Sequence, residues 1–591
     1  MPKGSIRAGY VVLCCLPIVL TAWFIAQHGF NVPFWDEWDS SAPIAIHTAD
    51  GTLSLEMLLM PHGQPRIFFT KLTVALSTLL TGWDVRFEMW VSFGLALISF
   101  GLLIAIMRRI HPPSTFWLML PFALLVFSVR QRHNWLMGFQ TLWFYMPLFT
   151  LAGLWVLVRL SVGWRALMLM MLCAVGASYA HLNGMALWVA LLPALWLRGY
   201  RHWRYYAAWI AAAAACIGLY FTNYALVDSG LSGVARPLDY LTYVLLYLGA
   251  PLVSESADSA FLALALAIMG LLLIGWNIRY VWQHVPRMVL AVPSALLLLS
   301  LAAGLITAVG RAKFMLVDGL GQPLSSRYVS ASNYFWVALL IFGTMAAWQA
   351  FGKRQFAIVG LNSFALVVGL IFYASANYGV LRLYDQAPFS TAQSRQCALN
   401  YLRSPNDPCL YRIHPVPEKH LTTMQALAAR RLTVYGDWYA DYPPADQPLL
   451  ASLQPLYGQF DSLPAWQIEA PDSFSLFQHP FSVAEQHLQL PDAERVFFEA
   501  EIYVDLQNRI EHPDVPQTGA IFRLSVRQGR TIRSLYEGSF DVNVERAPIP
   551  IRVDLSAWRG KAVVLVYETL VREGNPNYAW ATWLNPRIIF E

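Results

Sequence analysis

Charged side chains are scarce in this sequence: only 13% of its 591 residues are Asp, Glu, Lys or Arg, and the formal net charge is +5. No block of basic residues is present, so we expect no nucleic-acid partner. Hydrophobic residues instead make up 57% of the chain, and its mean hydropathy is +0.45. This composition is unlike that of a soluble enzyme and is typical of a polytopic protein of the lipid bilayer.

Cysteine is also rare, with six residues in the chain. No spacing of Cys and His suggests a zinc site, so the sequence predicts no metal ligands of that kind. Cys397 and Cys409 lie in the predicted outer part, where an oxidising compartment would let them close a short loop as a disulfide. The other four lie in apolar segments and are interpreted as small hydrophobic residues: Cys14, Cys15, Cys173 and Cys216.

A signal-peptide cleavage site is not evident after the first apolar segment, which is therefore predicted to be a retained helix. About eleven segments, some of them short, approach the roughly 20 residues that cross a bilayer. They lie near residues 9–27, 88–107, 114–129, 137–158, 166–180, 182–197, 205–222, 259–276, 289–309, 333–351 and 356–375. If they cross the membrane in alternating directions, every turn on the cytoplasmic side contains basic residues. This predicts a cytoplasmic N-terminus and an extracytoplasmic chain after residue 375.

Two further apolar segments are predicted to lie at the outer interface of the membrane. Residues 66–83 carry Arg66 and Lys71 in their first turns, and counting them as a span would invert the charge bias downstream. Residues 238–253 are interpreted in the same way. The first outer loop, residues 28–87, is therefore predicted to be long and structured.

The C-terminal third has a different pattern. Residues 376–480 are rich in proline and are predicted to form an extracytoplasmic linker or subdomain. Residues 481–591 contain short alternating runs, which predict a β-sandwich. The last run resembles the final strand of carbohydrate-binding jelly-roll modules, although a sandwich that only packs on the membrane domain is the alternative. The predicted fold class is thus an all-α membrane domain, residues 1–375, followed by these two parts.

Polar residues of the predicted membrane domain gather at its outer side. Because polar side chains within a membrane are costly, each of them is expected to have a structural or functional role. They come from loops far apart in the sequence: Asp36, Glu37, Asp39, His62, Gln64, Arg66, Arg130, Arg132, His133, Asn134, Gln140, His181, Asn183, Arg311, Lys313, Asp318, Arg327 and Tyr328. Carboxylates can act as general bases, arginines bind phosphate, and tryptophans stack on sugars. Together they predict a site for a lipid phosphate with a polar head group.

Five stretches carry a resemblance to a known family: FWDEWD, HGQPRIFF, NWLMGFQ, SRYVSASNYFW and CLYRIHPVPEKHL. The order of elements also resembles that of the GT-C glycosyltransferases. It begins with one helix, continues with a long outer loop that opens with paired acidic residues, and then has interfacial helices. These glycosyltransferases are polytopic enzymes that use polyprenyl-phosphate-linked sugars. The closest resemblance is to a group of uncharacterised bacterial membrane proteins, and it extends to about residue 440.

The resemblance implies an inverting sugar transfer at the extracytoplasmic face. An acid of the first outer loop would take the proton of the acceptor, which attacks the anomeric carbon while the lipid phosphate leaves. Asp36 is the predicted base, and Glu37 is a second candidate or a partner that tunes it. Arg327 is predicted to stabilise the departing phosphate, with help from Arg66 or Arg311.

The remaining candidates are predicted to hold the sugar or the phosphate: Trp35, Trp38, His62, Gln64, Asn134, Gln140, His181, Asn183 and Tyr328. Simpler roles stay open, such as a snorkelling anchor for Arg327 and hydrogen-bonded packing for His62 and His181. Asp36, Glu37 and Asp39 could also hold a divalent cation, magnesium or manganese, so metal dependence stays open.

Two other classes of function stay open, namely a transporter or flippase of a lipid-linked sugar and a non-catalytic glycan-assembly protein. A transporter predicts ionisable residues at the middle of the spans and internal repeats, and the sequence shows no clear repeat. The expected setting is the inner membrane of a bacterium. The expected partners there are a polyprenyl-phosphate-sugar donor and a glycan, lipid or protein acceptor.

Overall fold

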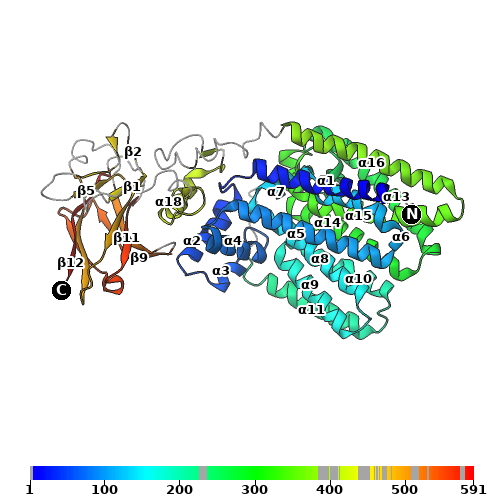
Figure 1. The fold of residues 1–591 in the computed structure, drawn as a ribbon, viewed down its shortest axis with the longest axis horizontal. Coiled ribbons are helices and arrows are strands. Elements are labelled where there is room, and N and C mark those ends of the chain that lie inside the picture. Colours follow the sequence, from blue (N-terminus) through cyan, green and yellow to red (C-terminus); the bar gives the residue numbers. More distant parts are fainter. Residues whose placement is uncertain are drawn as a thin grey trace. The chain divides into compact units, whose positions relative to one another are not determined.

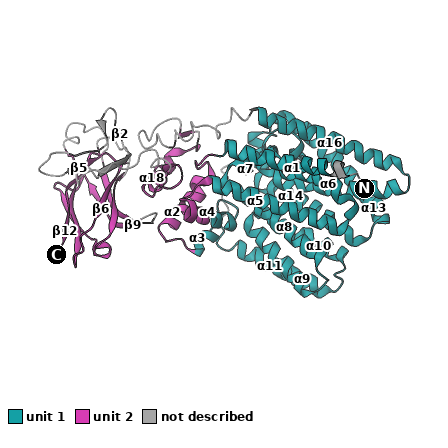
Figure 2. Ribbon diagram, in the orientation of Figure 1, with its two compact units in different colours: residues 1–29, 55–73, 86–390 teal, residues 30–54, 74–85, 391–591 magenta. Residues whose placement is uncertain are grey.

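The computed structural model divides the chain into two compact units (Figure 2). Unit 1 contains Met1–Gly29, Leu55–Thr73 and Arg86–Ser390, and unit 2 contains Phe30–Ser54, Val74–Val85 and Thr391–Glu591. The described residues are 4–224, 236–383, 398, 410–411, 413–436, 453–457, 459–460, 463–464, 466–468, 475–480, 482–506, 518–528, 531–572 and 579–590. The expected disulfide falls outside them, because neither Cys397 nor Cys409 is among the described residues.

Unit 1 is a bundle of helices (Figure 1). Its main helices are α1 Gly4–His28, α5 Val85–Ile110, α6 Pro112–Val126, α8 Leu142–Arg159, α9 Trp164–Ala180, α10 Ala186–Arg198, α11 Trp203–Tyr220, α12 Pro237–Gly249, α13 Ala260–His284, α14 Ala291–Asp318, α15 Val329–Gly352 and α16 Phe356–Leu383. Short turns connect several of them: α3 Leu55–Leu59, η2 Val129–Gln131, α7 Arg132–Leu136, η3 Gly138–Thr141, η4 Leu182–Met185, η5 Ala250–Leu252, η6 Ala257–Ser259, η7 Arg287–Leu290, η8 Gln322–Leu324 and η9 Ser326–Tyr328.

Eight stretches within the described residues are long and apolar enough to cross a membrane. They are Ala8–His28, Val85–Ile110, Pro112–Leu136, Gly138–Arg159, Ala257–His284, Arg287–Asp318, Ser326–Gly352 and Phe356–Arg382. Each coincides with a predicted span, so a multi-pass membrane protein is indicated. The three other predicted spans form α9, α10 and α11, which are not among the eight.

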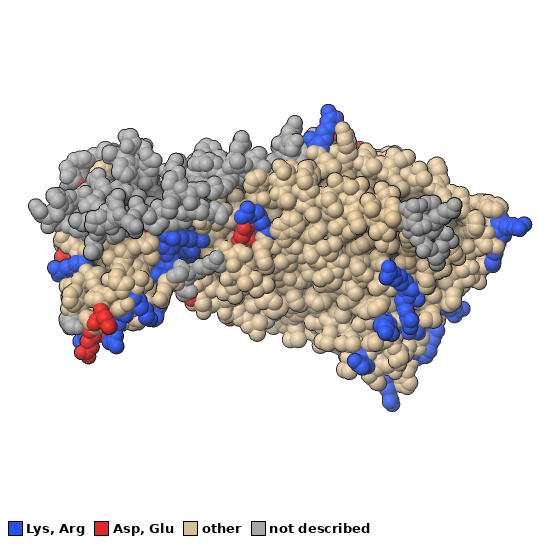
Figure 3. Space-filling model, viewed as in Figure 1, with Lys and Arg blue, Asp and Glu red and all other residues tan. Residues whose placement is uncertain are grey.

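The two segments predicted not to cross the membrane form short helices. Residues 66–83 contain α4, Phe68–Thr81, and residues 238–253 contain most of α12. With 14 and 13 residues, both are shorter than a span requires. On the face of unit 1 seen in Figure 3, uncharged side chains form a broad surface and Lys and Arg gather mainly toward one end.

Unit 2 contains two antiparallel sheets that form a β-sandwich. One sheet has the order β1-β6-β11-β8-β9 and the other β10-β7-β12-β5-β4, and a small third sheet pairs β2 with β3. The strands are β1 Leu453–Tyr457, β2 Gln459–Phe460, β3 Leu463–Pro464, β4 Trp466–Ile468, β5 Ser475–Gln478, β6 Ser482–Gln489, β7 Val496–Val504, β8 Gly519–Gln528, β9 Thr531–Asp541, β10 Ile549–Asp554, β11 Ala562–Val571 and β12 Ala581–Phe590.

The sandwich core is aromatic and closely packed. Trp583 on β12 is fully buried, and its ring lies 5.2 Å from Phe522, 5.4 Å from Tyr567 and 6.5 Å from Phe498. These residues come from strands of both sheets, so the alternating apolar positions of the sequence do form one shared core. A β-sandwich is confirmed in residues 481–591, but its sheets also include β1, β4 and β5, which lie in the segment 376–480 that was predicted to be a linker or subdomain.

Unit 2 also contains short helices from distant parts of the chain. Its N-terminal pieces are η1 Glu37–Ser41 and α2 Ala42–Ala49, and its later pieces are η12 Pro417–His420, α18 Leu421–Ala429 and the turn η13 Ser556–Trp558. The guanidinium of Arg430, at the C-terminal end of α18, donates to both carboxylate oxygens of Asp50 after α2, at 2.8 and 3.0 Å. This bidentate pair ties the start of the chain to residues near 430.

Candidate functional site

Unit 1 contains a polar centre that we call the arginine–tyrosine cluster. Its members are Asn134, His181, Tyr243, Tyr247, Arg311, Arg327 and Tyr328. Tyr328 is 3% exposed, and its ring lies 5.9 Å from the rings of both Tyr247 and Trp143. Trp143 in turn lies 4.2 Å from the ring of His181. Residues from loops far apart in the sequence therefore meet inside the helical unit.

Two arginines supply the charge of this cluster. The guanidinium of Arg327 lies over the ring of Tyr328, 5.2 Å from its centre. Arg311, on α14, has no ion-pair partner among the residues that the structure describes. Such a charge is costly in a membrane domain unless a ligand or water meets it, so this cluster suits an anion.

His181 is held as a neutral imidazole between α9 and η4. Desolvation lowers its pKa to about 3, and the positive charges of Arg311 and Arg327 add to this effect. Its Nδ1 accepts a hydrogen bond from the backbone amide of Asn183 at 3.1 Å, so the ring proton lies on Nε2. Gly184 permits this turn, since a Cβ there would lie 1.9 Å from the carbonyl oxygen of Ala177.

Asn134 connects the cluster to its surroundings. Its amide donates to the carbonyl of Arg327 at 3.1 Å and to the hydroxyl of Ser330 at 2.7 Å. It therefore positions the segment that carries Arg327 and Tyr328. The hydroxyl of Tyr328 accepts a hydrogen bond from the Gln322 amide at 3.2 Å.

Other arginines of unit 1 serve the protein itself. Arg66 donates to the carbonyls of Tyr220 at 2.7 Å and Thr222 at 2.6 Å, and also to that of Leu59. These bonds occupy its guanidinium, which favours a structural role over phosphate binding. Arg130 likewise donates to the carbonyls of Val253 and Leu324 at 2.6 and 2.5 Å.

Glu255 forms ion pairs with two neighbouring arginines. It lies 2.8 Å from Arg132 and 3.7 Å from Arg130. Burial alone would raise the pKa of Glu255, but the positive charges around it lower that pKa below its usual value. These two arginines are therefore matched by a carboxylate, unlike Arg311.

The other predicted binding residues of unit 1 lie among packed side chains. The side-chain amide of Asn183 donates to the hydroxyl of Thr307 on α14 at 2.8 Å. A Cβ at Gly310 of the same helix would lie 3.0 Å from the amide oxygen of Gln64. The ring of His62 lies 5.1 Å from that of Phe139, and Gln140 beside it is buried.

The acidic stretch at residues 34–39 belongs to unit 2. Trp35 has a positive φ of 47°, is 48% exposed and stacks on Phe34. Glu37 is 1% exposed, and its Oε2 accepts a hydrogen bond from the amide of Phe34 at 2.7 Å. Glu37 thus closes the turn, while Asp36 between them is only partly buried. Trp38 is 1% exposed, which favours core packing over a platform for sugar.

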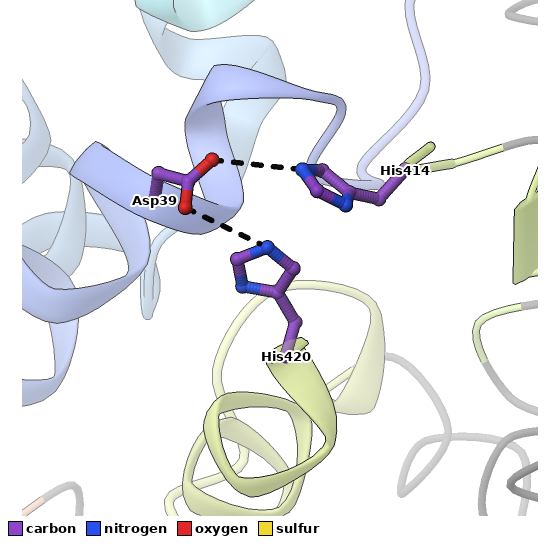
Figure 4. Close-up of side chains that lie close together, drawn as sticks. All are labelled: Asp39, His414 and His420. Carbon is purple, nitrogen blue, oxygen red and sulfur yellow. Dashed lines mark ion pairs between the residues drawn. The ribbon is translucent and has the colours of Figure 1, made fainter. Parts of the chain in front are cut away.

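A second polar centre of unit 2, the carboxylate–histidine cluster, consists of Asp39, His414 and His420 (Figure 4). The Nε2 atom of His414 lies 3.5 Å from Oδ2 of Asp39, and that of His420 lies 3.6 Å from Oδ1. Both rings point toward the carboxylate. The histidine side chains are 9% and 6% exposed and that of Asp39 is 49% exposed, so the cluster opens to solvent on one side.

No family model and no curated protein matches this chain. A fold alone does not determine a function, which depends on the side chains that form a site. The arginine–tyrosine cluster presents positive charge and neutral hydrogen-bonding groups, whereas the carboxylate–histidine cluster presents ligand atoms for a cation.

Local sequence explains how the two histidines reach Asp39. Pro417 begins η12, and the turn before it places Nδ1 of His414 where the amide of Val416 donates to it at 3.0 Å. His420 ends η12, directly before α18. The amide of Trp35 donates to the carbonyl of Ile413 at 3.0 Å, which fixes the acidic stretch beside this turn.

The sequence did not predict His414 and His420 as site residues. Both lie in the stretch CLYRIHPVPEKHL, which was singled out only for a resemblance. A pair of histidines six residues apart is a weak signal, because their third partner lies far away in the sequence. Asp39, which the sequence left without a definite role, is that partner.

Proposed function

We propose that this chain is a membrane glycosyltransferase that transfers a sugar, with inversion, from a polyprenyl-phosphate-linked donor to an acceptor at the extracytoplasmic face. The observation that carries the proposal is the pair Arg311 and Arg327, gathered around neutral His181 and the ring of Tyr328 in a helical unit with eight candidate spans. A lipid phosphate is an anion that can enter such a unit from the bilayer. The two arginines would bind it and stabilise the charge that develops as it leaves.

The rest of the reaction needs a base, and Asp36 keeps that role. It is a partly buried carboxylate in the acidic stretch, whereas the Glu37 carboxylate beside it accepts a bond from the Phe34 amide. The acceptor hydroxyl or amine would lose its proton to Asp36 and attack the anomeric carbon, and the carbon–oxygen bond to the lipid phosphate would break. The β-sandwich is proposed to be a jelly-roll module that binds the glycan.

The proposed orientation follows the basic residues. It places the N-terminus in the cytoplasm of a bacterial cell and unit 2 outside the inner membrane. This requires α9, α10 and α11 to cross the membrane in addition to the eight candidate spans. The charged end of unit 1 in Figure 3 supports one cytoplasmic end for the bundle.

The test uses full-length protein in liposomes, supplied with a panel of labelled undecaprenyl-phosphate hexoses and pentoses. Arg327→Gln and Arg311→Gln should each lower transfer about 10²- to 10³-fold, the usual cost of losing one stabilising donor. Both should also weaken the binding of undecaprenyl phosphate, measured as the shift that it causes in thermal unfolding. Arg108→Gln, an exposed arginine at the end of α5, is the matched control and should change neither quantity.

Two results would overturn this proposal. Transfer at the normal rate by a folded Arg327→Gln, Arg311→Gln double variant would remove the phosphate site. Movement of a labelled lipid-linked sugar across the bilayer, with no transfer to any acceptor, would favour a flippase instead.

A further inference from the structure

We propose that Asp39, His414 and His420 bind a divalent transition-metal ion of the zinc type. The ion would join the acidic stretch of residues 34–39 to residues 413–420 within unit 2. This inference goes beyond the proposed sugar transfer and does not depend on it.

The separations in the cluster fit a shared metal better than direct hydrogen bonds. The two nitrogen–oxygen distances, 3.5 and 3.6 Å, exceed the 2.7–3.2 Å usual for such a bond. Two ligands that each lie about 2.1 Å from a tetrahedral zinc are separated by about 3.4 Å. All three ligand atoms lie within 4.8 Å of one another, so one ion can reach them after a small inward movement.

The surroundings of His420 favour its binding to a metal ion. Its side chain is 6% exposed, and its Nε2 forms no hydrogen bond with any residue that the structure describes. A buried polar nitrogen without a bond is costly, and a metal ion would satisfy it.

His414 must reorganise when the ion binds. Because Nδ1 accepts a bond from the Val416 amide, the neutral ring carries its proton on Nε2, which faces Asp39. The ion would replace that proton, the proton would move to Nδ1, and the bond to the Val416 amide would break. The ring stays neutral, and its ion–nitrogen bond replaces the contact with Asp39.

The donor set and its exposure define the class of ion. Two imidazole nitrogens and one carboxylate suit zinc, iron or manganese, whereas magnesium and calcium prefer oxygen ligands alone. Asp39 is half exposed, so at least one position on the ion would stay open to water. Three protein ligands with an open position are typical of reactive rather than purely structural zinc sites.

The experiment uses full-length protein in detergent, with its affinity tag removed and metal stripped by a chelator. Zinc should bind with one high-affinity ion per chain in calorimetry, and magnesium at the same concentration should not compete. Cobalt should give the visible absorption of a four- or five-coordinate site. Absence of a high-affinity zinc site in the wild-type chain would overturn the proposal.

Ligand variants locate the ion. His414→Ala, His420→Ala and Asp39→Ala should each weaken zinc binding at least about 100-fold, the upper range for losing even an outer-shell partner. His47→Ala is the matched control, because this histidine of α2 pairs with Thr52 instead. Zinc binding as tight as wild type in all three ligand variants would place the ion elsewhere and overturn the site.

A conservative replacement guards against variants that fail to fold. His420→Cys keeps a zinc ligand at the same place, so it should retain zinc and add a thiolate-to-cobalt absorption band in the near ultraviolet. A folded His420→Cys protein without that band contradicts the assignment. Asp36→Asn should keep zinc whatever happens to sugar transfer, so failure of the metal site and failure of the proposed function can be told apart.

Discussion

The two polar centres of this protein differ in the kinds of charged side chain that they bring together. The arginine–tyrosine cluster of unit 1 combines Arg311 and Arg327 with the neutral imidazole of His181 and the ring of Tyr328. The carboxylate–histidine cluster of unit 2 combines one carboxylate with two imidazoles whose nitrogens converge. The first is suited to an anion and the second to a cation. If both proposals hold, we expect that substitutions can remove either binding site without altering the other.

The largest expected effect concerns Asp36, which belongs to neither cluster. Asp36→Asn should lower sugar transfer by about 10²- to 10⁴-fold, because the amide cannot accept the proton of the acceptor. The binding of undecaprenyl phosphate and of zinc should both remain, since neither cluster is touched. Transfer assays and the two binding measurements on one preparation check this, and a folded variant with normal transfer would remove Asp36 as the base.

A second comparison sets the buried carboxylate of Glu485, which forms ion pairs, against Arg311, which has no ion-pair partner among the described residues. Glu485 on β6 is fully buried between Arg431 and Arg527, at 2.5 Å from each. Glu485→Gln should lower the free energy of unfolding by about 3–5 kcal/mol, because both guanidinium groups lose their partner. Chemical denaturation followed by β-sheet circular dichroism measures this loss.

The matched control for that loss is another carboxylate of the sandwich. Glu499 on β7 pairs at 2.9 Å with Arg587, whose side chain is 66% exposed. Glu499→Gln should therefore cost only about 0–1 kcal/mol. Arg311→Gln should also change stability little while it weakens phosphate binding. An equal loss of stability in all three variants would contradict the distinction between matched and ligand-binding charges.

Much of the fold could be predicted from local sequence. Apolar runs long enough to cross a bilayer became helices where they were expected, because helix length and hydropathy are read directly from the chain. The alternating runs became β7, β8, β10, β11 and β12. Strands β6 and β9 of the same region were not among these runs. The β6 sequence SVAEQHLQ contains Glu485, which is buried only through its pairing with arginines from elsewhere. That pairing depends on tertiary contacts, which the period of a strand does not reveal.

The candidate site could be predicted only in part. Arginines and histidines in apolar surroundings are conspicuous, so the residues of the arginine–tyrosine cluster could be named in advance, except for Tyr243 and Tyr247. Their roles could not be predicted from the sequence. Arg66 and Arg327 were both candidates for binding phosphate, yet the guanidinium of Arg66 donates to three backbone carbonyls. The carboxylate–histidine cluster was not predicted, because Asp39 is far from the two histidines in the sequence and meets them only through the packing of unit 2.

Removal of metal should loosen one cluster and leave the other unchanged. At a zinc concentration 100 times the dissociation constant, the ion stabilises the protein by about 2.7 kcal/mol, or about 100-fold in the opening equilibrium. A chelator should therefore speed amide hydrogen exchange in residues 34–41 and 413–429 by up to that factor. Exchange in α14 and α15 should stay constant. Equal acceleration in both regions would show that the ion does not act at the carboxylate–histidine cluster.

The smallest expected effect comes from the ion pair of Arg430 and Asp50, which supports the metal site from a distance. It holds the end of α18 to the residue after α2, and those two helices begin beside His420 and Asp39. Asp50→Asn removes the charge but keeps the shape, so zinc affinity should fall only about 10-fold, the lower range for a supporting contact. The transfer of sugar should not change, and phosphate binding in unit 1 should be as in the wild type. Calorimetry of Asp50→Asn beside His420→Ala measures this ranking, and a loss as large as that of the ligand variant would mean that the pair itself, not the ion, holds these segments together.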